Sequence, residues 1–164
     1  MRRSNIKAIA LGGLLAALTV VIMCLGTFIP VATYLCPMLS CIVQFLVLRY
    51  CGKRIAWTWY AAVCILCLLL APDKEAAMVF LAVGIYPLIK DDIEKTKIRR
   101  LLKFLYFNLA ISACYAIMIW VMGMMYLVEE NMEWGLWGLA LMLLLGNITF
   151  FLLDRVLTII KLKK

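Results

Sequence analysis

Three consecutive charged residues, Asp73, Lys74 and Glu75, separate two apolar segments and are the side chains best placed to do chemistry. Acidic side chains beside one lysine suit a cationic or zwitterionic molecule, and a carboxylate can also act as a general acid or base. The same residues have a structural interpretation, because Asp73 suits the N-cap of the following helix and Glu75 its first turn. The sequence leaves both interpretations open.

Motifs of the common enzyme classes are missing. The chain has no histidine, no GxxxxGK[ST] loop, no HExxH and no GxSxG. Cys64 and Cys67 form a CxxC pair, but they fall inside a predicted membrane helix, where a thiol behaves as a small hydrophobe. A lipid-modifying enzyme that used Asp73 or Glu75 would need a second catalytic group, and the sequence offers none. We therefore predict no enzymatic activity, no metal site and no cofactor.

The amino-acid composition indicates whether these residues lie in a soluble protein or in a membrane. Of 164 residues, 67% are hydrophobic, and the mean hydropathy is +1.04, which is more apolar side chain than a soluble domain of this length can bury. The net charge is +8, but the positive side chains lie in short loops between apolar runs. We predict an all-α polytopic integral membrane protein, a single transmembrane domain over residues 1–164 that binds lipid and no nucleic acid.

Six apolar runs supply the elements that position the charged turn. The predicted helices cover residues 8–29, 31–48, 55–71, 74–89, 104–128 and 134–153. The fourth is too short for a hydrocarbon core of about 30 Å, and short helices at membrane depth are tolerated where they line a cavity. Residues 90–103 predict a solvated loop, with an interfacial helix as the alternative. Gln44 is a polar residue within a span and needs a partner.

The charge distribution predicts the orientation. With both termini in the cytoplasm, 16 of the 17 basic residues lie inside and only Lys74 lies outside. Five of the nine acids, in the turns at 73–75 and 129–133, then lie outside. This asymmetry is typical of six helices with an N-in, C-in topology.

Small residues recur on one face of the first helix. Ala8, Gly12 and Ala16 follow at steps of four, and Gly13 and Ala17 lie beside them. Another backbone can approach closely on such a face. The face therefore either packs within the protein's own bundle or docks a partner protein.

The overall plan, with small residues in the segment IKAIALGGLLAALTVVI, resembles the S components, the membrane-embedded substrate-binding subunits of energy-coupling factor vitamin transporters. The resemblance implies a bacterial cytoplasmic membrane, a small-molecule pocket on the outer half, and docking of the first helix onto a transmembrane coupling protein driven by separate ATPases. The first outer loop, 27–33, is shorter than the lid of many such subunits. The substrate-binding residues that it implies are Tyr34, Asp73, Lys74, Glu75, Glu129, Glu130 and Trp134.

The leading hypothesis is a substrate-binding subunit of an importer, because a chain without a nucleotide site must take its energy from a partner. The alternative is a membrane scaffold or assembly factor, in which the small residues pack internally and Asp73 and Glu75 only cap a helix. The segment PDKEAAMVFLAVGIYPLIK also resembles an uncharacterised bacterial membrane family.

Overall fold

The computed structural model describes residues 2–26, 32–120, 123 and 135–162, and their regular structure is entirely helical. Four stretches of the described chain are long and apolar enough to cross a membrane. These are Ile6–Leu25, Tyr34–Cys51, Lys53–Leu70 and Arg99–Trp120. The helical class is confirmed, and the chain has helices of the membrane-spanning type. The chain forms two compact units, Met1–Lys95 and Thr96–Lys164.

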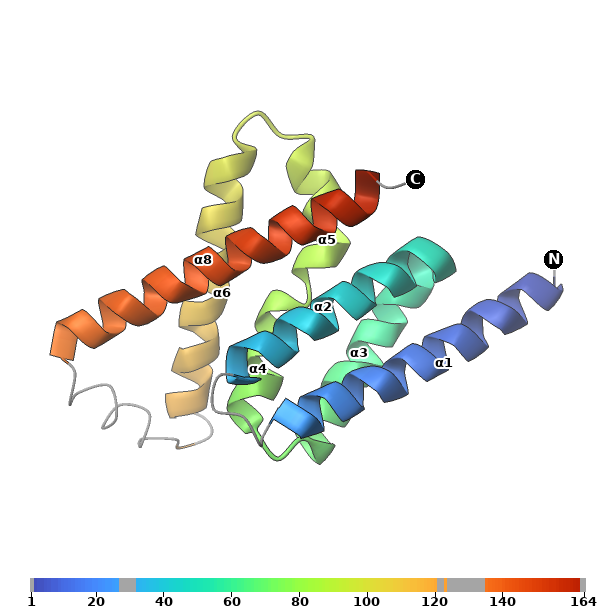
Figure 1. The fold of residues 1–164 in the computed structure, drawn as a ribbon, viewed down its shortest axis with the longest axis horizontal. Coiled ribbons are helices and arrows are strands. Elements are labelled where there is room, and N and C mark those ends of the chain that lie inside the picture. Colours follow the sequence, from blue (N-terminus) through green and yellow to red (C-terminus); the bar gives the residue numbers. More distant parts are fainter. Residues whose placement is uncertain (1, 27–31, 121–122, 124–134, 163–164) are drawn as a thin grey trace. The chain divides into compact units, whose positions relative to one another are not determined.

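The first unit contains α1 (Arg2–Leu25), α2 (Ala32–Cys51), α3 (Lys53–Leu70), α4 (Lys74–Val83) and α5 (Tyr86–Glu94). Helix α2 is its central element, since α1, α3, α4 and α5 all pack against it (Figure 1). Helix α1 also packs against α3. Helix α2 is the most buried of the four stretches that are long enough to cross a membrane, and its Ser40 and Gln44 side chains are fully buried.

A single glycine turns the chain between α2 and α3. Gly52 has φ +88°, a left-handed conformation that residues with a Cβ rarely adopt. Its N–H donates to the Leu48 carbonyl at 3.2 Å, and its own carbonyl accepts from the Ala56 N–H at 3.0 Å. The end of one helix is therefore bonded directly into the start of the next, which makes α2 and α3 a tight hairpin.

The predicted fourth helix is two helices. Helix α4 ends at Val83 and α5 begins at Tyr86. Pro87 has no N–H to donate to the Val83 carbonyl, which removes one bond of a continuous helix. The Gly84 N–H closes α4 on the Phe80 carbonyl at 2.7 Å. The break is therefore encoded locally, by the glycine and the proline that follows.

The predicted solvated loop at 90–103 is wrong at both ends, because α5 continues to Glu94 and α6 begins at Arg99. Lys90, the first residue of the predicted loop, is fully buried. Its Nζ lies 3.5 Å from Glu94 Oε1 and 5.8 Å from the centroid of the Tyr86 ring. The ion pair and the aromatic ring compensate the buried charge and hold the last turn helical. Helices α4 and α5 contain 10 and 9 residues, and neither is among the four stretches that are long and apolar enough to cross a membrane.

The second unit pairs α6 (Arg99–Trp120) with α8 (Gly135–Leu162) in antiparallel directions. Lys103 Nζ lies 2.8 Å from Asp154 Oδ2, and the carboxamides of Asn108 and Asn147 donate to each other at 3.2 and 3.3 Å. The predicted end at residue 153 is too early, because Asp154 is paired across the interface and does not have to leave the helix.

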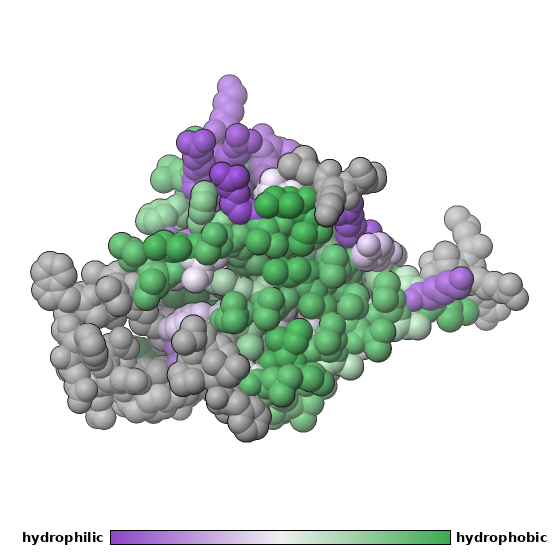
Figure 2. All heavy atoms as spheres, in the orientation of Figure 1, coloured by the Kyte–Doolittle hydropathy of each residue, from purple (hydrophilic) through white to green (hydrophobic). Residues whose placement is uncertain are grey.

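The exposed surface of both units is strongly apolar. Leu14, Leu69 and Leu109 are each about 70% exposed, which is expected of side chains that face lipid. Green, hydrophobic atoms dominate the coloured surface in Figure 2, and purple, hydrophilic atoms gather at the top of the view, over the turn that follows α5. The apolar surface fits the membrane class predicted from composition.

Candidate functional site

The structure brings four of the predicted site residues, Tyr34, Asp73, Lys74 and Glu75, together at one end of the first unit. Asp73 Oδ1 accepts a hydrogen bond from the Ala76 N–H at 3.0 Å, so the predicted N-cap of α4 is confirmed. The Tyr34 hydroxyl donates to Glu75 Oε1 at 3.3 Å. This contact ties the start of α2 to the start of α4.

Lys74 closes the end of a different helix. Its Nζ donates to the carbonyls of Leu68 and Ala71, each at 2.8 Å, which lie at the C-terminus of α3. A cation at this position satisfies carbonyls that have no partner within the helix and opposes the helix dipole. The charged turn therefore joins α2, α3 and α4, and its capping role is established. Binding of a ligand by these half-buried side chains stays a prediction.

The remaining predicted substrate residues, Glu129, Glu130 and Trp134, lie outside the described residues.

Two members of the small-residue row on α1 pack within the first unit. The Trp59 indole N–H of α3 donates to the Gly12 carbonyl at 2.9 Å. The Cys51 thiol donates to the Ala8 carbonyl at 3.2 Å. Both carbonyls belong to α1, so Ala8 and Gly12 serve the protein's own bundle.

The neighbouring small residues face outward. Gly13 and Ala17 are exposed, and a Cβ added at Gly13 would meet no atom within 4 Å. Ala16 is half-buried between the two faces. A docking surface for a partner on α1 therefore stays a prediction for Gly13 and Ala17.

A second polar site lies deeper, on α2. Ser40 and Gln44 are one helical turn apart, and both side chains are fully buried. Among the described residues, the Ser40 hydroxyl oxygen and both polar atoms of the Gln44 carboxamide have no hydrogen-bond partner. A Cβ built on Gly84 would lie 3.2 Å from Gln44 Oε1, which places the carboxamide against the break between α4 and α5.

The depth of this site follows from helix geometry. Tyr34 contacts Glu75 and Gln44 contacts Gly84, so α2 and α4 run parallel and share one interface. Gln44 is about 15 Å along α2 from Tyr34, or half of a hydrocarbon core of about 30 Å. The charged turn and the Gln44 carboxamide therefore lie at opposite ends of one α2–α4 interface.

Leaving a buried polar group without a partner costs about 1–3 kcal/mol. Such groups are rare in folded proteins and require an explanation. Membrane proteins place polar binding sites near the bilayer midplane, where a discontinuous helix frees backbone groups. The Tyr60 hydroxyl already donates to one carbonyl of this kind, that of Leu81 in the last turn of α4. Ser40 and Gln44 beside this helix break are therefore the candidate polar binding site.

The sequence contained signs of this site that the predicted residue set did not include. Gln44 stood out as a polar residue within a span, and Ser40 lies four positions before it. Gly84 and Pro87 close together in the short fourth run mark the break. The sequence could not show that the side of α2 that carries Ser40 and Gln44 faces this break.

The cysteines and acids form no metal site in the part of the chain that the structure describes. All seven cysteines carry free thiols, and Cys64 and Cys67 are buried on α3. Packing within the bundle accounts for their position.

Comparison with protein-family models, with curated proteins and with solved structures finds no match to this chain. The functional argument therefore depends on the geometry of the site.

Proposed function

We propose that this chain is a membrane-embedded binding subunit for a small polar molecule, similar in role to the S components of energy-coupling factor importers. The observation that carries the proposal is the fully buried Gln44 carboxamide, which has no partner among the described residues. A carboxamide offers two donors and an acceptor, and the Ser40 hydroxyl adds one more donor. A bound molecule with complementary groups would remove the cost of burying them.

The proposal includes a topology of six crossings, with α4 and the apolar start of α5, as far as Ile89, sharing the fourth and both termini in the cytoplasm of a bacterium. The distribution of basic residues supports it, since Lys74 alone lies on the outer side. In this orientation the turn at 73–75 faces outward, and a ligand enters between Tyr34 and Glu75 on its way to Gln44.

The partner in this proposal is a transmembrane coupling protein with separate ATPases. The sequence has no nucleotide-binding loop, so energy for transport must come from another chain. The exposed Gly13 and Ala17 of α1 are the surface offered to it. Gly13→Leu with Ala17→Leu should abolish co-purification of the partner, whereas Ala61→Leu with Ala62→Leu, at exposed positions of α3, should not.

The binding proposal is tested by native mass spectrometry of the protein extracted from its own membrane in mild detergent. The wild-type protein should carry a small-molecule adduct, and the Gln44→Leu variant should lose it. Ser112→Ala removes an exposed hydroxyl from α6 and should leave the adduct in place. An adduct that survives Gln44→Leu, or a wild-type protein with nothing bound, would refute the proposal.

A scaffold or assembly factor is the second candidate. The observation that favours it is that the charged residues have structural contacts: Asp73 caps α4, and Lys74 and Glu75 join α4 to α3 and α2. A scaffold would purify with an unrelated membrane complex and would not depend on Gln44.

A further inference from the structure

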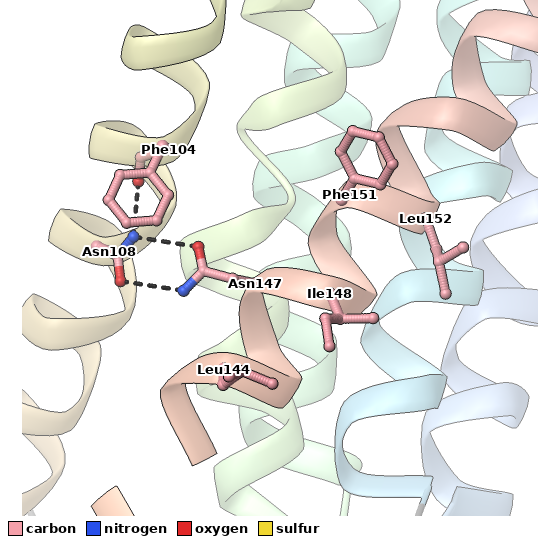
Figure 3. A pocket seen from close by; sticks show the side chains of 7 residues that line it. All are labelled: Phe104, Asn108, Leu144, Asn147, Ile148, Phe151 and Leu152. Atoms are coloured by element: carbon pink, nitrogen blue, oxygen red, sulfur yellow. Dashed lines mark hydrogen bonds between the residues drawn. The ribbon is translucent and has the colours of Figure 1, made fainter. Parts of the chain in front are cut away.

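The second unit contains a groove that the binding proposal does not use. It lies between α6 and α8 and has a volume of about 560 Å³, within the range of about 300–1,000 Å³ that is usual for small-molecule sites. Its walls are apolar, and Figure 3 shows the side chains that line it. They include Phe104 of α6 and Leu144, Ile148, Phe151 and Leu152 of α8.

The polar groups of the groove are already engaged. Asn108 and Asn147 donate to each other across the groove (Figure 3), and Asn108 Nδ2 also donates to the Phe104 carbonyl at 2.9 Å. The groove therefore favours an apolar occupant.

Two arginines continue the rows of groove-lining residues beyond one end. Arg100 lies one turn before Phe104 on α6, and Arg155 lies one turn after Phe151 on α8. Both are exposed, and among the described residues neither has a carboxylate partner. The nearby acid, Asp154, is already bound to Lys103 at 2.8 Å. This end of the groove therefore carries positive charge without a counter-ion from the described chain.

The spacing matches one leaflet of a bilayer. Leu144 to Arg155 covers about 16 Å of helix at about 1.5 Å per residue. Half of the hydrocarbon core is about 15 Å. An acyl chain lying in the groove would thus place its phosphate at the level of the two arginines.

We propose that the α6–α8 groove binds one anionic phospholipid, with an acyl chain along the apolar walls and its phosphate between Arg100 and Arg155. Guanidinium groups match phosphate geometry with paired hydrogen bonds. This site is separate from the Gln44 site and does not require that the protein transport anything.

The test is native mass spectrometry of the full chain released from nanodiscs of equal phosphatidylcholine and phosphatidylglycerol. The wild-type protein should retain phosphatidylglycerol preferentially. Each guanidinium–phosphate contact should contribute about fivefold, so Arg100→Gln with Arg155→Gln should lower that preference roughly 30-fold. The control variant, Arg54→Gln with Arg99→Gln, removes the same charge at positions that do not continue the rows of groove-lining residues. It should keep the preference for phosphatidylglycerol. Equal loss in both pairs would overturn the site and leave only a general charge effect.

A second measurement identifies the occupant directly. A photo-crosslinking amino acid at Ile148 should form its adduct with a phospholipid acyl chain in nanodiscs. Crosslinks to peptides of this chain, or to a second copy, would show that protein fills the groove and would refute the lipid. Excess glycerol phosphate should not displace the bound lipid, and displacement by it would show a phosphate site without an acyl requirement.

Discussion

Replacing Gln44 by leucine should stabilise the ligand-free protein. Leucine has a similar volume and no polar atoms, so the change removes two buried polar atoms that have no partner among the described residues. An unsatisfied buried polar group such as this carboxamide costs about 1–3 kcal/mol. We expect the free energy of unfolding to rise by about 1–3 kcal/mol, or about 5-fold to 150-fold in the unfolding equilibrium.

The measurement is reversible unfolding of the purified, ligand-depleted protein by titration with SDS in mixed micelles. Tyr60→Phe is the matched control, because it changes a polar group at the same helix break with the opposite consequence. The Tyr60 hydroxyl donates to the Leu81 carbonyl, and its loss leaves that carbonyl without this donor. Tyr60→Phe should therefore lower the free energy of unfolding by about 1–3 kcal/mol.

The reasoning fails if Gln44→Leu destabilises the protein as much as Tyr60→Phe does. That result would mean that the Gln44 carboxamide is hydrogen-bonded in the free protein. The cost of burial would then be absent, and so would the argument for a ligand. Changes of opposite sign in the free energy of unfolding for the two variants would support a binding site that lowers the stability of the ligand-free protein.

Three further predictions concern stability. Gly84→Ala should lower the free energy of unfolding by about 1–3 kcal/mol, because the new Cβ would lie 2.6 Å from the Phe80 carbonyl oxygen. Gly13→Ala, in open space on α1, should raise it by about 0.5–1 kcal/mol. Equal shifts of the unfolding midpoint in the two variants would contradict both predictions. Asp73→Ala should cost about 1 kcal/mol through loss of the N-cap bond, measured by the same unfolding titration, and an unchanged midpoint would refute the cap. The pKa of Asp92 lies below its usual 3.8 because its carboxylate accepts hydrogen bonds from two lysines and lies near their charge. The stabilisation that Asp92 gains from the two lysines is therefore present above pH 3.8 and is lost as the pH falls through the lowered pKa. The unfolding midpoint, measured against pH, should fall in this range. Asp92→Asn should flatten that part of the profile.

Features that depend on local chemistry could be predicted from the sequence. Apolar composition gave the helical membrane class, and the position of Asp73 after an apolar run gave the N-cap. The single helix expected over 74–89 is wrong, although Gly84 and Pro87 mark the break locally. The loop expected over 90–103 is wrong for α5 because a charged stretch does not distinguish a surface lysine from a buried one such as Lys90. Its burial depends on Tyr86 and Glu94, whose positions follow only from α5 being helical.

Features that depend on which helices meet could not be predicted. Asn108 and Asn147 are polar residues in separate helices, and nothing in either segment shows that their carboxamides bond to each other. The same limit applies to Gly12, whose spacing fits a docking face and a contact with Trp59 equally well. Long-range packing decides between such alternatives, because small residues permit close approach without specifying the partner.

The most direct test of the proposed function is purification of the tagged protein from its native membrane in mild detergent, with every co-purifying chain and small molecule identified by mass spectrometry. The account predicts a transmembrane coupling protein with its ATPases, and a small polar molecule that is absent from the Gln44→Leu preparation. Recovery of the chain with an unrelated membrane complex and no bound molecule would contradict the account and favour the scaffold.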